Sequence, residues 1–320
     1  MSQPAPSSPP WKRILAWAAK LTVGALLIWL LSRRVPLHDA LSVLGTASPG
    51  LWLLGTGMSA AVLAIGAYRW HLTALRSIPM KTCLAYSWIG HFYSTVLPGA
   101  VVGDVAKTAA LATSDTRHRT MVLPVSVALD RLLGLVSLLL VLVLALVAMG
   151  GEKKGLHPAL VAFGTGVIVS GLVALPQIMS AGLSLAKRLR FLPHAVVHGI
   201  DRVNFVLHQI SVRQWLLMLA LSVLMHALAG SVFIVGAREF GMAVEAWRLG
   251  LYYVAVSFVI VLPVTVAGIG AREQLSFWIL GASAGAATMP VALSWFLLLT
   301  SLVHAVIGAL VQLAGWVRRA

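Results

Sequence analysis

Acidic side chains and cysteines are scarce in this chain of 320 residues. It contains 9 Asp and Glu residues and a single cysteine, Cys83. One cysteine excludes an internal disulfide and a cysteine-rich zinc site. Charged residues of both signs make up only 10% of the chain, whereas soluble globular proteins carry about 25%. The composition therefore excludes a soluble enzyme, a disordered chain and a disulfide-stabilised secreted domain.

Apolar residues take the place of the missing charge. They amount to 59% of the chain, and the mean hydropathy is +0.93. These values are typical of an all-α, polytopic membrane protein. The longest stretch between apolar runs is roughly Ala181 to Arg213, which is too short for a folded catalytic domain. Any activity must therefore be built from the membrane helices themselves.

Apolar runs long enough to cross a bilayer, about 20 residues each, predict six full spans. The runs are Ile14–Leu31, Gly50–Tyr68, Met121–Met149, Pro158–Met179, Gln214–Ala237 and Pro290–Val317. We expect residues 1–12 to form a disordered tail, because Ser and Pro dominate there, and residues 13–320 to form a single transmembrane domain. Residues 181–212 place basic side chains among leucines and valines, which predicts an amphipathic segment on the cytoplasmic membrane surface.

Two further apolar regions contain helix breakers near their centres. Cys83–Ala112 is broken at Pro98, and Leu249–Gly281 is broken at Pro263 with glycines beyond it. Each region is too long for one straight span with that many breakers. Each therefore predicts two half-length helices folded into a re-entrant hairpin, with the broken backbone facing protein or a wet cavity.

The distribution of basic residues predicts the orientation of these elements. If each hairpin enters and leaves on one side, the inner side holds Lys12, Arg13, Arg69, Arg76, Lys81, Arg117, Arg119, Lys187, Arg188, Arg190, Arg202, Arg213, Arg318 and Arg319. The outer side then holds Arg33, Arg34, Lys153, Lys154, Arg238 and Arg248. The excess predicts a multi-pass protein of the bacterial inner membrane with both termini cytoplasmic. The first hairpin would enter from the cytoplasm and the second from outside. Since the net charge of +15 sits in these short clusters, it does not indicate nucleic-acid binding.

The two broken regions resemble each other in sequence. Leu97–Lys107 aligns without gaps on Leu262–Arg272, and leucine, proline, valine, glycine, alanine and a basic residue recur in register. Inverted repeats with discontinuous helices are a recurring transporter architecture, with the substrate site near the bilayer midplane. We therefore predict inverted pseudo-repeats at about residues 50–150 and 213–317.

The breaks would bring charged side chains to the bilayer centre. We expect each second half-helix to begin just after its proline, so that its free N–H groups attract anions and Lys107 and Arg272 lie about two turns further along. Asp130 and Arg131 fall near the middle of the next span, where charges are costly and are functional candidates. The candidate substrate-binding residues are Gly103, Asp104, Lys107, Asp130, Arg131, Gly268, Gly270, Arg272 and Glu273.

This candidate set is nearly neutral, since three basic side chains face three acidic ones. It could hold a phosphate without gross excess charge, or its members could pair only with one another and hold the hairpins in place. His226 and His304 fall within spans and could relay protons, or could hydrogen-bond to neighbouring helices. No metal-ligand spacing or Gly-rich phosphate loop stands out, and no cofactor is expected.

At these residues the chain resembles the lysylphosphatidylglycerol synthase transmembrane-domain family. These flippase-like proteins of bacteria and archaea are related to the membrane half of the multiple peptide resistance factor. The resemblance rests on Leu97–Lys107, Leu129–Gly134 and Pro263–Glu273, and it covers about Ile14 to Val317. The family commonly has glycine at position 102 and arginine at position 107, where this chain has Val102 and Lys107.

The resemblance implies a protein that binds or moves an anionic or otherwise amphiphilic membrane lipid. Because the chain lacks the soluble aminoacyl-transferase domain of two-part members, lipid aminoacylation is not expected. Our leading hypothesis is a lipid transporter in which Lys107, Arg131 and Arg272 hold a phosphate-bearing headgroup. Asp104, Asp130 and Glu273 would position these basic side chains. The alternatives are a membrane-embedded transferase that acts on a lipid carrier, with an aspartate as base, and a small-anion transporter.

Overall fold

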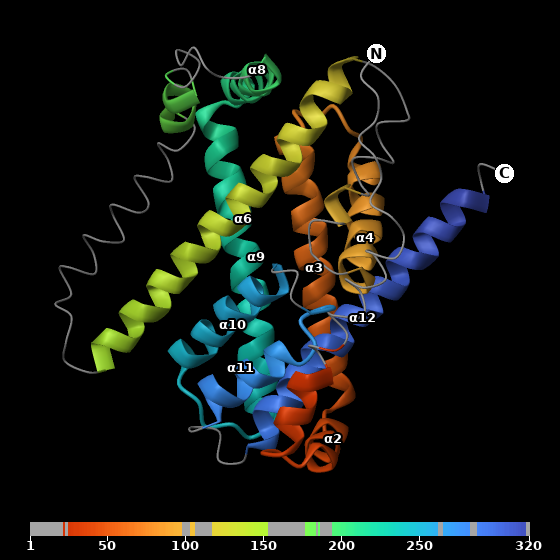
Figure 1. Ribbon diagram of the computed structural model, residues 1–320, viewed down its shortest axis with the longest axis vertical. Helices are drawn as coiled ribbons and strands as arrows, with labels where there is room; N and C mark the ends of the chain where they lie inside the picture. The colour runs from red at the N-terminus through yellow and green to blue at the C-terminus, as the bar shows by residue number, and fades with distance from the viewer. Residues whose placement is uncertain are drawn as a thin grey trace.

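The computed structural model describes residues 22, 25–97, 103–105, 117–152, 177–183, 185, 194–261, 265–281 and 287–317. All regular secondary structure in these ranges is helical. The helices of Figure 1 are α2 (Leu37–Gly45), α3 (Pro49–Thr73), α4 (Met80–Val96), α6 (Arg117–Glu152), α8 (His194–Gln209), α9 (Val212–Glu239), α10 (Ala246–Val261), α11 (Ala271–Leu280) and α12 (Thr288–Val317). The protein is therefore an all-α, polytopic membrane protein, as predicted.

Four helices are long and apolar enough to cross a bilayer. They are α3, α9, most of α12 and the Val122–Leu144 part of α6. They confirm four of the six predicted spans. The other two, Ile14–Leu31 and Pro158–Met179, lie largely outside the described residues, as does the predicted tail at residues 1–12.

The second broken region forms two short helices, as predicted. α10 has 16 residues, α11 has 10, and the two pack against each other. Between them the chain turns through Gly268 and Gly270, whose φ angles of +72° and +85° are freely adopted only by glycine. α11 consequently begins at Ala271 and not directly after Pro263. Arg272 therefore lies in the first turn of α11, which corrects our prediction of a position two turns into the helix.

The first broken region is described only in part. α4 ends at Val96, so a break follows at the predicted place. Residues 103–105 are helical, and Gly103 lies so close to α4 that a Cβ at this position would collide with the carbonyl oxygen of Gly90 and with Ser94 Oγ. Lys107 lies outside the described residues.

The two broken regions enter the bundle from opposite ends (Figure 1). α3 and α9 pack against each other and run in opposite directions. α4 begins at the end of the molecule where α8 lies, whereas the α10–α11 pair lies toward the opposite end, beside α2 in the view. The inverted pseudo-repeats at about residues 50–150 and 213–317 stay a prediction.

Small residues allow the spans to approach closely. A Cβ on Gly55 would lie 2.6 Å from the ring of Phe296, and one on Gly236 would lie 2.7 Å from Leu293 Cδ1. α12 therefore packs tightly on both α3 and α9. Close approach of this kind provides van der Waals contact where lipid gives no hydrophobic driving force between helices.

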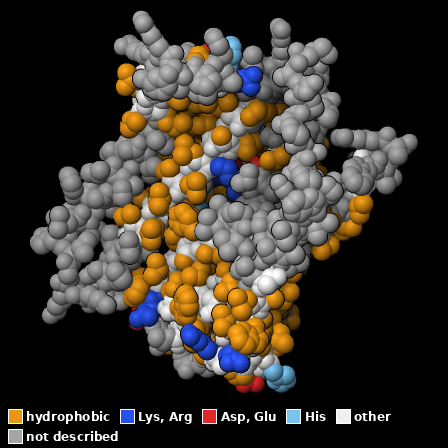
Figure 2. Space-filling view, viewed as in Figure 1, with side chains coloured by type: hydrophobic (Ala, Val, Ile, Leu, Met, Phe, Trp, Pro, Cys, Tyr) orange, Lys and Arg blue, Asp and Glu red, His pale blue; other side chains and the backbone are white. Residues whose placement is uncertain are grey.

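The surface is consistent with a lipid environment. Figure 2 shows mainly hydrophobic side chains over the middle of one face, with basic side chains near the lower end and a further basic patch at mid-height. α8 lies across the other end of the bundle and contacts α6 (Figure 1). It buries Val206 and Leu207 and exposes Phe205 and Arg202, so the described part of the predicted 181–212 segment is two-sided.

Candidate functional site

A cavity of about 520 Å³ lies between the two halves of the bundle. Its walls are mostly apolar and come from α3, α4, α6, α9, α10, α11 and α12. The volume falls within the range of about 300–1,000 Å³ that is usual for small-molecule sites. Its ionisable lining residues are Arg69, His91, Asp130, Arg131, Tyr253, Arg272 and His304.

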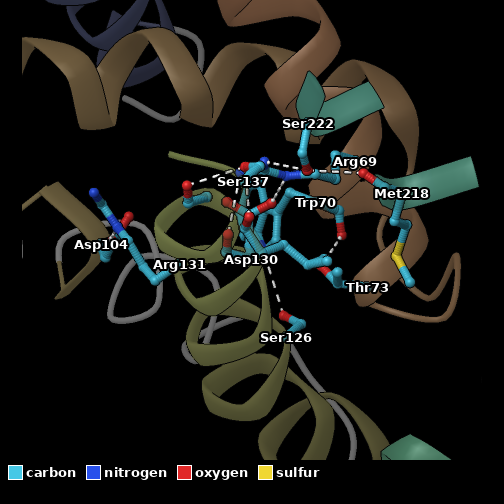
Figure 3. Close-up of polar contacts among 12 residues, drawn as sticks. Arg69, Trp70, Thr73, Asp104, Ser126, Asp130, Arg131, Ser137, Met218 and Ser222 are labelled. Atoms are coloured by element: carbon cyan, nitrogen blue, oxygen red, sulfur yellow. Dashed lines mark hydrogen bonds and ion pairs between the residues drawn. The ribbon is translucent and has the colours of Figure 1, made fainter. Parts of the chain in front are cut away.

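The first charged group in the cavity joins three spans around Arg69. Its Nε donates to Asp130 Oδ1 at 2.7 Å, and its Nη2 donates to the backbone oxygen of Asp130 at 3.1 Å. Its Nη1 donates to Ser222 Oγ at 2.8 Å. Arg69 is only 5% exposed, so α3, α6 and α9 meet at a compensated internal charge (Figure 3).

The second charged group joins the first broken region to α6. Arg131 Nε donates to Asp104 Oδ2 at 2.5 Å. The Arg131 side chain is 44% exposed, whereas that of Asp104 is 10% exposed. Figure 3 shows this pair set apart from the Arg69 group, although Asp130 and Arg131 are neighbours in the chain. The Arg131–Asp104 pair therefore lies at the more open part of the site.

The third charged group forms at the beginning of α11. Arg272 Nε donates to Glu273 Oε1 at 3.0 Å, and Ser294 Oγ donates to the same oxygen at 3.2 Å. Glu273 Oε2 accepts from the backbone N–H of Gly270 at 2.6 Å, which satisfies a donor at the helix N-terminus. The carboxylate of Glu273 is thus fully engaged, and it orients Arg272.

One amino group of the Arg272 guanidinium has no described hydrogen-bond partner. Arg272 is 4% exposed and lines the cavity, and its Nη2 has no hydrogen-bond partner among the residues that the structure describes. A buried donor without a partner costs about 1–3 kcal/mol. A ligand oxygen in the cavity would remove that cost.

The predicted site residues differ in whether they line the cavity, pair with a lining residue or lie elsewhere. Asp130, Arg131 and Arg272 line the cavity, and Asp104 is paired with Arg131. The remaining predicted residues are Glu273, which caps α11, Gly268 and Gly270, which form the turn before it, Gly103, which packs on α4, and Lys107, outside the described residues.

Arg69 lines the cavity, which the sequence did not predict. The apolar run that ends at Tyr68 places Arg69 among the inner-side charges. In the structure α3 continues to Thr73, and Arg69 is buried. The apolar Trp70 and Leu72 that follow were the signal that the helix continues, since a flanking charge would be followed by polar residues.

The two histidines within spans differ in their bonding. His226 is bonded on both ring nitrogens, with Nδ1 2.5 Å from Tyr253 Oη and Nε2 near Gly134 O and Ser137 Oγ. It links α6, α9 and α10 and does not line the cavity. His304 lines the cavity and is bonded through Nε2 to the carbonyl oxygen of Thr56 at 3.1 Å.

The three charged groups share one pattern of pairing. Each of the three arginines gives its Nε to a carboxylate, so the charges balance in pairs. Among the residues that the structure describes, no three His, Cys, Asp or Glu side chains are placed to hold a metal ion. The cavity is thus lined by the arginines of three ion pairs, and Arg272 Nη2 is a donor without a described partner.

Comparison with known proteins completes the description of the site. No curated protein sequence matches this chain. A family model described as the lysylphosphatidylglycerol synthase TM region matches residues 17–308, a range that includes every cavity residue named above. This family is concerned with membrane lipids. The chain therefore belongs to the lysylphosphatidylglycerol synthase TM-region family and is a multi-pass membrane protein related to lipid handling.

Proposed function

We propose that the protein is a lipid transporter of the bacterial inner membrane that moves an anionic phospholipid between leaflets. The observation that supports this function is the buried Arg272, which lines a cavity between the two halves of the bundle and whose Nη2 has no described hydrogen-bond partner. A lipid phosphate carries the acceptor oxygens that this donor lacks. Charge-assisted hydrogen bonds between arginine and phosphate are about twice as strong as neutral ones.

The rest of the cavity suits the other parts of a lipid. Apolar side chains such as Leu63, Val232 and Leu298 form most of the wall and tolerate the glycerol backbone. The acyl chains would stay in the surrounding bilayer while the headgroup occupies the cavity. Since Arg272 bonds Glu273 through Nε, a monoanionic phosphate would bind at Nη2 without breaking the bonds that cap α11.

Passage of the headgroup requires an ion pair whose two side chains can separate. The Arg131–Asp104 pair is the more exposed of the charged groups in the site. As the headgroup moves, its phosphate would replace Asp104 at Arg131, and Asp104 would recover its partner when the lipid leaves. Rocking of one repeat against the other would expose the cavity to each leaflet in turn.

The test uses purified protein in liposomes with a fluorescently tailed phosphatidylglycerol, whose movement is followed by chemical quenching from outside. Arg272→Ala is expected to slow transport about ten-fold or more, because it removes a charged hydrogen-bond donor. Arg272→Lys should recover part of the rate, since a point charge remains but the planar fork is lost. Because Lys107 aligns with Arg272 in the sequence repeat, Lys107→Ala should also slow transport strongly.

The matched control is Arg248→Ala. Arg248 also lies on a hairpin helix and also pairs with a carboxylate, Glu245 at 2.9 Å, but it does not line the cavity. Transport by this variant should equal that of the wild type. Wild-type rates in both Arg272→Ala and Lys107→Ala would remove the proposed headgroup site. Phosphate flux without lipid movement would replace the function with small-anion transport.

A further inference from the structure

His304 lines the cavity and has one buried ring nitrogen without a described hydrogen-bond partner. The residue is 2% exposed and lines the cavity from α12. Its Nε2 lies 3.1 Å from the carbonyl oxygen of Thr56. A carbonyl only accepts, so Nε2 must carry the hydrogen. The other ring nitrogen, Nδ1, has no hydrogen-bond partner among the described residues.

The surroundings keep the ring uncharged and fixed in place. Within the described part of the chain, His304 forms no ion pair. Burying a lone imidazolium is costly, so the neutral ring is favoured. The rings of Trp88 and His91 pack edge-on against it, each with its centroid 6.3 Å away. In the neutral ring Nδ1 is a hydrogen-bond acceptor.

Three lining hydroxyls on α4, α10 and α12 also offer hydrogen-bond acceptors to a ligand. The hydroxyl of Thr95 donates to His91 O, that of Thr300 to Leu297 O and that of Ser257 to Tyr253 O, at 2.8, 3.0 and 2.8 Å. Each hydrogen is used within its own helix, so only oxygen lone pairs remain for a ligand. These hydroxyls and His304 therefore offer acceptors, whereas Arg272 offers a donor.

The acceptor and the donor lie at different depths. Ser294, which bonds the Glu273 carboxylate beside Arg272, precedes His304 by 10 positions in α12. At 1.5 Å per residue their backbones are about 15 Å apart along the helix. A ligand that satisfies both sites needs a phosphate for Arg272 and a hydrogen-bond donor beyond it.

We propose that His304 selects the headgroup, with Nδ1 accepting a hydrogen bond from a hydroxyl group on the transported anionic lipid. This inference rests on the proposed transport function and names its substrate class. A hydroxyl fits better than an ammonium group, because the cavity carboxylates are already engaged by arginines. A lipid with the same charge but no headgroup donor leaves Nδ1 unpartnered and binds less tightly.

The test compares two probes on the full-length protein in detergent by binding titration. Phosphatidylglycerol carries headgroup hydroxyls, and phosphatidylmethanol has the same charge but none. We expect the wild type to bind phosphatidylglycerol about five-fold more tightly, which is the effect of one neutral hydrogen bond. His304→Gln places an amide near the position of Nε2, so the Thr56 bond is kept while the Nδ1 acceptor is lost. Its binding ratio should fall to about one.

Two variants separate recognition from structure. His304→Asn places its amide near the position of Nδ1, so part of the five-fold preference should return. His71→Gln changes a histidine at the end of α3, outside the cavity, and should keep the full preference. Thermal unfolding of each variant identifies any that fails to fold, and in that case the wild-type and His304→Asn ratios decide.

A wild-type ratio near one would overturn the inference, as would an unchanged preference in folded His304→Gln. Neither result depends on transport, because both are measured in detergent. A wild type that discriminates between the probes but moves no lipid in liposomes would keep the headgroup selection and reject the transport function.

Discussion

At the scale of single residues, the arginines of the site differ in how many of their N–H groups have hydrogen-bond partners. Arg69 donates hydrogen bonds to Asp130 and Ser222, and it joins three spans. Arg272 donates from Nε to Glu273, and its Nη2 has no described partner. The same residue type therefore joins helices in one position and, by our proposal, binds a headgroup in the other. What separates them is the number of partners, not burial, since both are almost fully buried.

A prediction for Arg69 follows from its bonding. Arg69→Ala leaves the Asp130 carboxylate half-buried without its partner and should lower the free energy of unfolding by about 3–5 kcal/mol. Asp130→Ala together with Arg69→Ala removes the unpaired charge and should recover a large part of that loss. Thermal or denaturant unfolding in detergent measures the three variants. If the double variant is no more stable than Arg69→Ala alone, the pair is not coupled as described.

At the scale of helices, the lengths of apolar runs predicted the spans well and their ends less well. α9 begins with a capping box between Ser211 and Gln214, close to the predicted start of the span at Gln214. α3 continues past the predicted end at Tyr68, because its last turns are covered by other helices instead of water or headgroups. The breaks were predictable from proline and glycine. The start of α11 was not, since a turn with two positive-φ glycines precedes it.

The contact between α4 and α12 provides a prediction at this scale. A Cβ on Gly308 would collide with the backbone oxygen of Trp88, so only glycine allows this approach. Gly308→Val should therefore separate α4 from α12 and destabilise the fold by about 1–3 kcal/mol. It should also weaken transport, because His91 bonds Ser301 across the same interface.

Gly315→Val, in the same helix, is the matched control. Nothing lies within 4 Å of a Cβ at this position, so the substitution adds volume without a collision. Its melting temperature should stay close to that of the wild type. Equal destabilisation by the two valines would mean that helix propensity, and not the contact with α4, accounts for the effect.

At the scale of the whole molecule, the two halves provide the cavity together. α4 begins at one end of the bundle and α10 at the other (Figure 1), and both reach the same cavity. Neither half encloses it alone. A site formed between inverted halves can open to one side and then the other by relative movement of the halves, which a site within one half cannot do.

The opposite entry of the two halves predicts opposite labelling. In a Cys83→Ser background, Lys81→Cys marks the start of α4 and Glu245→Cys the approach to α10, and both positions are exposed. A membrane-impermeant maleimide applied to intact cells should label Glu245→Cys but not Lys81→Cys. Inverted vesicles should give the reverse pattern. Labelling of both positions from the same side would contradict the inverted arrangement.

The sequence by itself determined the membrane environment, the four confirmed spans and the places where helices break. Few charges and long apolar runs require helices in lipid, where each backbone group must bond within its own segment. Proline and glycine in the middle of such runs mark broken helices, and charged residues beside them mark a site. These inferences depend on composition and spacing along the chain, which local physics controls.

Only the tertiary structure decided which partner each side chain has. Asp130 and Arg131 are adjacent in the chain, yet Asp130 bonds Arg69 on α3 and Arg131 bonds Asp104 near α4. Arg272 Nη2 and His304 Nδ1 likewise lack described hydrogen-bond partners because of the side chains that pack around them. Pairing depends on distances between segments far apart in sequence, which no local pattern encodes. Which polar atoms are paired and which are left without a partner is therefore decided when the helices pack.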